Sequence, residues 1–204
     1  MFSLWLRGFA LGFAIAASPG PIFFLCVRRT LVQGRLIGLA SGFGVATADG
    51  FYAAIATFGV AAAAAAFVSI RQPLALVGGV LLIVLGIRIA LDRTVAAEAA
   101  APTPRGLAWA YVSTLGLTIT NPATILSFAA LAATLGLGTG GSFVRPGAVV
   151  AGVLLGSAAW WCVLVTGASI LRARVTPRIV RGVSTFSGLA IIGLGILAGY
   201  SALT

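Results

Sequence analysis

The sequence predicts an all-α integral membrane protein with six transmembrane helices in two inverted three-helix repeats, with broken first and fourth helices. Its composition is the first reason: 60% of the 204 residues are hydrophobic and 8% are charged, whereas water-soluble domains carry about 25% charged residues. The second reason is a pair of proline motifs, Ser18-Pro19-Gly20-Pro21 and Asn121-Pro122, at corresponding places in the two halves. Hydrocarbon offers no partner to freed backbone groups, so such a break has to pack on protein or line a cavity.

The predicted helices occupy the long stretches between ionisable residues, because one span needs about 20 apolar residues. We expect them near residues 8–27, 36–64, 73–91, 107–135, 147–171 and 182–203. The third is short, since Pro73 and Arg88 limit it. Residues 1–18 also have the outline of a signal peptide. The apolar sequence continues to Val27, however, so we expect a first span there rather than a cleaved leader.

The arginines lie mostly at the ends of predicted helices, where they indicate topology. A net charge of +10 would suggest nucleic acid as the partner of a soluble domain, but between spans it follows the positive-inside rule. Three alternate loops hold ten arginines: Arg28, Arg29, Arg35, Arg88, Arg93, Arg105, Arg172, Arg174, Arg178 and Arg181. The opposite side holds Arg7, Arg71 and Arg145. We therefore expect these three loops in the cytoplasm, both termini outside it, a multi-pass location in the plasma (inner) membrane, and no nucleic-acid partner.

The predicted helices divide into a first three-helix repeat at residues 1–91, a cytoplasmic linker at 92–106 and a second three-helix repeat at 107–204. An odd number of spans in each copy places the copies in opposite orientation. Residues 17–22 and 120–125 carry the two matching motifs, each in the first helix of its half. Glycines four residues apart in the second helices allow helix backbones to approach closely, and they would also suit a homodimer.

Asp49 is the acidic residue inside a predicted span, about 20 Å along its helix. An ionised Asp at the centre of a helix costs about 2.5–3.5 kcal/mol on insertion scales, so such a residue is a functional candidate. It could bind a substrate ammonium, a metal cation or a coupling proton. The alternative is a structural Asp that is hydrogen-bonded to Thr47, Tyr52 or a neighbouring helix.

The two proline motifs are candidate substrate-binding segments, because prolines remove backbone donors and Gly20 adds flexibility. A helix that restarts after such a break offers free N–H groups and the positive end of its dipole, which suit a carboxylate. Asn121-Pro122 could do the same from the opposite side, with Asn121 as the cap. A kink that affects packing alone is the alternative, since proline is common in transmembrane helices.

The sequence gives little support for an enzyme or for a metal or cofactor site. Histidine is absent, Asp49 stands alone in the membrane, and Cys26 and Cys162 do not form a C-x-x-C pair. Aspartyl proteolysis, a Ser-His site and thiol–disulfide transfer therefore lack their residues, and we expect neither an enzyme nor a metal or other cofactor. Trp160 and Trp161 lie well inside the fifth span, as a cavity wall or as part of the bundle core.

The order of these motifs resembles the LysE-type (lysine/threonine exporter) amino-acid exporter family. The resemblance rests on Ser18-Pro19-Gly20-Pro21, Gly34-x-x-x-Gly38, Asp49, Asn121-Pro122, and Gly152-x-x-x-Gly156-Ser157 followed by Trp161, and it covers roughly residues 8–203. It implies six helices in two inverted repeats and export of amino acids, driven by the proton or membrane gradient. The functional residues that it implies are Pro19, Gly20, Pro21, Asp49, Asn121 and Pro122. Many members carry Lys or another polar residue where this chain has Ala123, so their substrate preference does not transfer.

These residues suggest a substrate cavity between the two halves, lined by the breaks with Asp49 beside them. The carboxylate of an amino acid would meet backbone N–H groups, and its ammonium would meet Asp49, which would also couple a proton. Rocking of the halves would then alternate access. The alternatives are a cation (cadmium-type) efflux transporter of the same superfamily, an aquaporin-like channel suggested by the single Asn121-Pro122-Ala123 motif, and a purely structural membrane protein.

Overall fold

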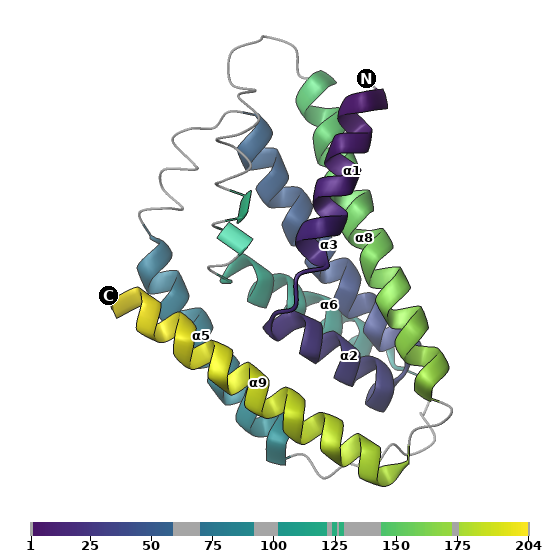
Figure 1. Cartoon of the computed structure of the whole chain (residues 1–204), viewed down its shortest axis with the longest axis vertical. Helices are drawn as coiled ribbons and strands as arrows, with labels where there is room; N and C mark the ends of the chain where they lie inside the picture. Colours follow the sequence, from purple (N-terminus) through teal and green to yellow (C-terminus); the bar gives the residue numbers. More distant parts are fainter. Residues whose placement is uncertain are drawn as a thin grey trace.

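The computed structural model describes residues 2–58, 70–91, 102–121, 124–125, 127–128, 144–172 and 176–203. The elements within these residues are helices (Figure 1): α1 (Phe2–Ala16), α2 (Pro21–Gln33), α3 (Arg35–Thr57), α5 (Arg71–Leu91), α6 (Pro104–Ile119), α8 (Val144–Arg172) and α9 (Pro177–Leu203). Stretches long and apolar enough to cross a membrane lie at Gln72–Leu91, Pro146–Leu171 and Arg178–Tyr200, and α1 with α2 makes a fourth if the bent pair is one span. The described residues are therefore all-helical with three or four candidate membrane spans, as the sequence predicts, and the arrangement of six spans in two inverted repeats stays a prediction. The second and fourth predicted spans run on into residues outside the described part.

The first predicted helix, at residues 8–27, is two helices joined at an angle of 79°. α1 ends at Ala16, where the Ala17 and Ser18 N–H groups still donate to carbonyls of its last turns. Pro19 has no N–H to continue this pattern, and Pro21 then stands in the first turn of α2, where a missing N–H is tolerated. The break lies where the sequence predicts it, but it turns the chain sharply rather than kinking one span.

α2 and α3 are joined by Gly34 alone. Its N–H donates to the Arg29 and Thr30 carbonyls, at 3.1 and 3.2 Å, and so caps the end of α2. Its backbone angles, φ 103° and ψ 169°, belong to a region that is essentially open to glycine only. Arg28 and Arg29, which the charge pattern places in a cytoplasmic loop, therefore lie within α2.

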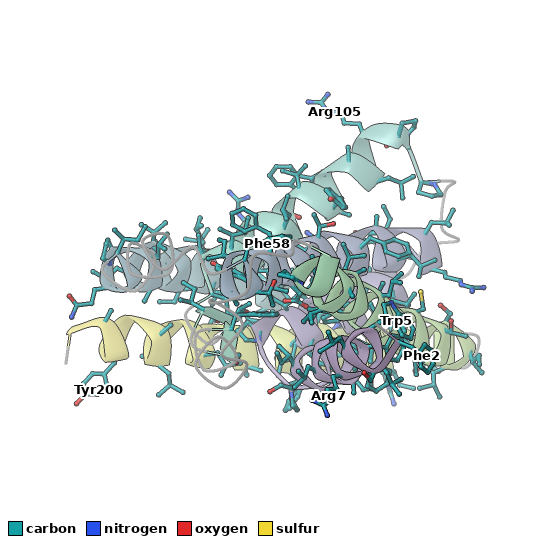
Figure 2. All side chains as sticks on the ribbon, turned by 90° about the horizontal axis from the view of Figure 1, so that it is seen from above. Phe2, Trp5, Arg7, Phe58, Arg105 and Tyr200 are labelled. Atoms are coloured by element: carbon teal, nitrogen blue, oxygen red, sulfur yellow. The ribbon has the colours of Figure 1, made fainter. Side chains whose placement is uncertain are left out.

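α6 begins at Pro104, inside the stretch 92–106 that the sequence predicts as a linker, of which residues 92–101 lie outside the described part. The hydroxyl oxygen of Thr103 accepts a hydrogen bond from the Gly106 N–H at 3.1 Å and caps the helix. Arg105 points away from the other helices at this end of α6 (Figure 2). The start of α6 is thus fixed by a Thr-Pro cap that hydropathy alone does not detect.

Glycines bring α1 and α8 into close contact along their length, as the two adjacent ribbons in Figure 1 show. A Cβ atom at Gly8 or Gly12 of α1 would meet the backbone of α8, and one at Gly152 or Gly156 of α8 would meet the backbone of α1. α3 packs on α6 in a similar way, with Gly44 against the Tyr111 carbonyl. Small residues therefore hold α1, α3, α6 and α8 together as one bundle.

α5 and α9 form a second body, an antiparallel pair that lies side by side along one edge in Figure 1. Gly79 faces Gly195, and Gly86 faces Gly188. The pair packs chiefly on α2, through α9, and has a smaller contact with the bundle, between α5 and α6. Apart from α2 with α3, these packed pairs join one of the helices α1, α2, α3 and α5 to one of the helices α6, α8 and α9, so the two halves of the chain are interleaved.

We expect Gly156→Ala to destabilise the protein by about 1–3 kcal/mol, the usual cost of overpacking, because the added methyl group would meet the backbone of Phe9. Gly167→Ala is the matched control on α8, since a Cβ there meets no atom within 4 Å. Thermal unfolding of the purified protein in detergent measures both variants. Equal melting temperatures would contradict the close approach of α1 and α8.

Candidate functional site

A cavity of about 120 Å³ lies where the break between α1 and α2 meets α3, α6 and α8. The residues predicted as a site from the sequence come together in its wall: Ser18, Pro19, Gly20, Pro21, Asp49 and Asn121. Pro122 lies outside the described residues. Two breaks that are about a hundred residues apart in sequence thus face one space, together with Asp49.

The first break contributes the start of α2 to the cavity wall. Gly20 has extended backbone (φ −146°, ψ −174°), and its carbonyl accepts from the Phe24 N–H at 3.4 Å. Ile22 and Phe23 also line the cavity, and their N–H groups belong to the first turn, where a helix has no internal acceptor to offer. The positive end of the α2 dipole therefore lies at the cavity.

The second break follows the end of α6 at Ile119. The Asn121 N–H donates to the Thr118 carbonyl at 3.1 Å, and the Asn121 carbonyl accepts from the Thr124 and Ile125 N–H groups at 3.1 and 3.2 Å. Asn121 thus ends one helical segment and starts the next through its own backbone. The phenol of Tyr52, on α3, donates to the Ile119 carbonyl and covers a backbone acceptor that the break exposes.

Asp49 is buried in α3, with 2% of its surface exposed. Its carboxylate accepts a hydrogen bond from the Ser157 hydroxyl of α8 at 2.7 Å. The sequence left Thr47, Tyr52 or a neighbouring helix as partners, and the bond comes from the neighbouring helix, since Thr47 donates to the Phe43 carbonyl. A carboxylate has about four acceptor positions, so the Ser157 bond leaves capacity for a ligand in the cavity.

Trp161 fits both roles that the sequence left open, because it lines the cavity and is also buried in an apolar cluster with Ala16, Ile22 and Val45. Trp160 packs its ring edge-on against Phe13, with ring centroids 5.3 Å apart, and belongs to the packing around that cluster. The indole N–H groups of both tryptophans are buried with no hydrogen-bond partner among the described residues.

Several polar residues of the site were not predicted from the sequence. Thr118, Thr124 and Ser127 line the cavity beside the second break, and Ser157 holds Asp49. The spacing of Thr118, Asn121 and Thr124, three residues apart, places them on one side of a helical path, and this signal could have identified them. The bond between Ser157 and Asp49 joins residues 108 positions apart, which no local pattern predicts.

The model of the LysE type translocator family matches residues 13–202. Neither the curated proteins nor the solved structures gave a match. The matched range contains both breaks, Asp49 and every other described residue that lines the cavity.

We expect dicyclohexylcarbodiimide, an apolar reagent for protonated carboxyl groups, to modify Asp49 because this residue lines a cavity. Ser157→Ala should raise the rate severalfold, since it removes the hydrogen bond that holds the carboxyl group. Intact-protein mass spectrometry measures the adduct, and Asp49→Asn is the control that should carry none at this position. An adduct yield in the parent no greater than in Asp49→Asn would show that the cavity does not admit the reagent to Asp49.

Proposed function

Because the chain belongs to the LysE type translocator family, we propose that this membrane transporter exports amino acids or close derivatives from the cytoplasm. The observation that carries the proposal is the cavity in which both helix breaks and Asp49 meet. Membership of a transporter family also agrees with the expectation that the chain is not an enzyme.

The charges at the cavity suit a zwitterion. The start of α2 offers backbone N–H groups and a positive dipole end to a carboxylate. Asp49 offers a negative side chain to an ammonium. Ile15, Val45 and Trp161 supply apolar wall between the polar groups. An α-amino acid carries its ammonium and its carboxylate on one carbon atom, so a small cavity with one group of each kind would hold both and leave the side chain against the apolar wall.

Asp49 would also couple transport to the proton gradient. A carboxylate that binds the ammonium cannot hold a proton at the same time, so protonation of Asp49 would release the substrate. The Ser157 hydroxyl, at 2.7 Å, would keep the carboxyl group oriented in both states. Access to the cavity would alternate by relative motion of helix groups, as in other secondary transporters.

The interleaved packing supports a different choice of moving helix groups from the two halves of the chain. The bundle of α1, α3, α6 and α8 contains both halves of the chain, and so does the pair of α5 and α9. We therefore assign the motion to these two bodies instead of to the two halves. By the arginine distribution, the Gly34 end of α2 would face the cytoplasm and both termini would lie outside it, in the plasma (inner) membrane.

We expect Asp49→Asn to slow amino-acid efflux about tenfold or more, because hydrogen bonds to charged groups contribute about 1.5–3 kcal/mol. The remaining efflux should also lose its dependence on external pH. Efflux from cells preloaded with a panel of labelled amino acids measures both effects. Thr57→Val is the matched control, since Thr57 is on the same helix, does not line the cavity and donates to the Ala53 carbonyl of its own helix.

Unchanged efflux and pH dependence in Asp49→Asn, at equal membrane levels, would contradict this mechanism. If the parent protein accelerates the efflux of no amino acid, the proposed substrate class is wrong. Cadmium efflux would then be the next activity to measure, because Asp49 could instead receive a cation.

A further inference from the structure

Two adjacent arginines lie buried near the end of α2. Arg28 is 4% exposed and Arg29 is 7% exposed, whereas Arg35, just beyond α2, is exposed. Arg7 and Arg105 point away from the helices around them (Figure 2). An arginine remains protonated in proteins, so α2 keeps two positive charges inside the protein. The positive-inside rule does not require these arginines to be buried, because an exposed arginine would set the membrane topology equally well.

Arg29 binds α2 to the bundle. Its guanidinium donates to the Ser41 hydroxyl of α3 at 2.9 Å, to the Ala110 carbonyl of α6 at 3.1 Å and to the Ser113 hydroxyl of α6 at 2.9 Å. One side chain therefore joins three helices, and these include helices from both halves of the chain.

Arg28 connects α2 to the other body. Its Nε donates to the Ser184 hydroxyl of α9 at 3.1 Å, and Ser184 is itself buried with 2% exposed. α2 is thus held on one side by the bundle, through Arg29, and on the other side by the pair of α5 and α9, through Arg28.

The oxygens that receive the Arg29 guanidinium are hydroxyls and a carbonyl, not carboxylates. Such bonds can break without separating an ion pair, which in a buried site would be far more costly. Asp49, the acid within the described helices, is instead hydrogen-bonded to Ser157. The three hydrogen bonds from Arg29 hold α2 in place. Among the described residues, no carboxylate forms an ion pair with this guanidinium that would have to separate when α2 moves.

Both ends of α2 have backbone features that allow the helix to turn as a unit. At its start, residues 17–20 form no helix, and a Cβ at Gly20 would meet no atom within 4 Å. At its end, Gly34 is the single residue between α2 and α3. Arg29 lies about 10 Å along the helix from the cavity-lining residue Ile22.

We propose that α2 is a hinged gate and that Arg29 is the latch that holds it against α3 and α6 at the end away from the cavity. The inference rests on the proposed transport function for its role in the cycle. In each cycle the bonds from Arg29 to Ser41, Ala110 and Ser113 break, α2 turns about residues 17–20 and Gly34, and the cavity opens toward the Gly34 end. Arg28 keeps α2 attached to α9 during this movement.

Cys26 is a native probe of the latch, because it lies on α2 one turn before Arg29 and is fully buried. In a Cys162→Ser background, the rate of Cys26 alkylation by N-ethylmaleimide reports how often α2 leaves its place. We expect Arg29→Gln to raise this rate at least about fivefold. The double variant Ser41→Ala with Ser113→Ala should raise it in the same direction while the charge of Arg29 stays. Arg35→Gln, which removes an exposed charge beside the same hinge, is the matched control and should react at the parent rate.

Parent-rate labelling in both Arg29→Gln and the double serine variant would overturn the proposal, and so would equal acceleration in Arg35→Gln. If Arg29→Gln does not reach the membrane, the double serine variant decides alone. The labelling needs no substrate, so it tests the latch even if no amino acid is exported. If the proposed function also holds, an exported amino acid should change the Cys26 labelling rate of the parent protein.

Discussion

The need to satisfy backbone groups at the two helix breaks constrains the rest of this structure. A chain in hydrocarbon cannot leave N–H and C=O groups open to lipid, so each break has to be enclosed by other helices. The glycines of α1 and α8 bring these two helices into close contact before the first break. On α8, Gly156 packs on the backbone of α1, and the next residue, Ser157, donates to Asp49 of α3. One turn of α8 thus contacts both α1 and Asp49 of α3.

The sequence predicted the positions of the breaks but not their shape. Prolines and glycines act locally, so the motifs at 18–21 and 121–122 identify the points where helices end. The 79° angle between α1 and α2 depends on packing against α3, α8 and α9, which no local signal contains. The sequence placed both breaks and Asp49 around one cavity because the two motifs occupy corresponding positions in the two halves of the chain, and the structure brings Ser18, Asp49 and Asn121 to one cavity.

Arg28 and Arg29 show where the charge pattern misleads. An arginine between apolar stretches is read as a loop residue, because an unpartnered charge inside a membrane protein is costly. Here the acceptors come from Ser41, Ala110, Ser113 and Ser184, which lie as far as 156 positions away. A hydropathy pattern does not show that these distant residues will accept hydrogen bonds from the two arginines. Gly34 is the second reason why the two arginines do not lie in a loop. Its backbone conformation allows α3 to start immediately after α2 and leaves no loop for the arginines to occupy.

The length of α2 gives the cavity a mechanical connection to the latch. A helix of 13 residues is about 20 Å long, and its internal hydrogen bonds make it move as a rigid unit. A ligand bound at the first turn of α2 would therefore act on Arg28 and Arg29 through the helix backbone, without passing through side-chain contacts. If the bundle and the pair of α5 and α9 met directly, they would have to slide over a wide surface to change access to the cavity. A short helix that is attached to each body by hydrogen bonds from arginine to uncharged acceptors needs only the exchange of a few acceptors, and the breaks at its ends would provide the rotation.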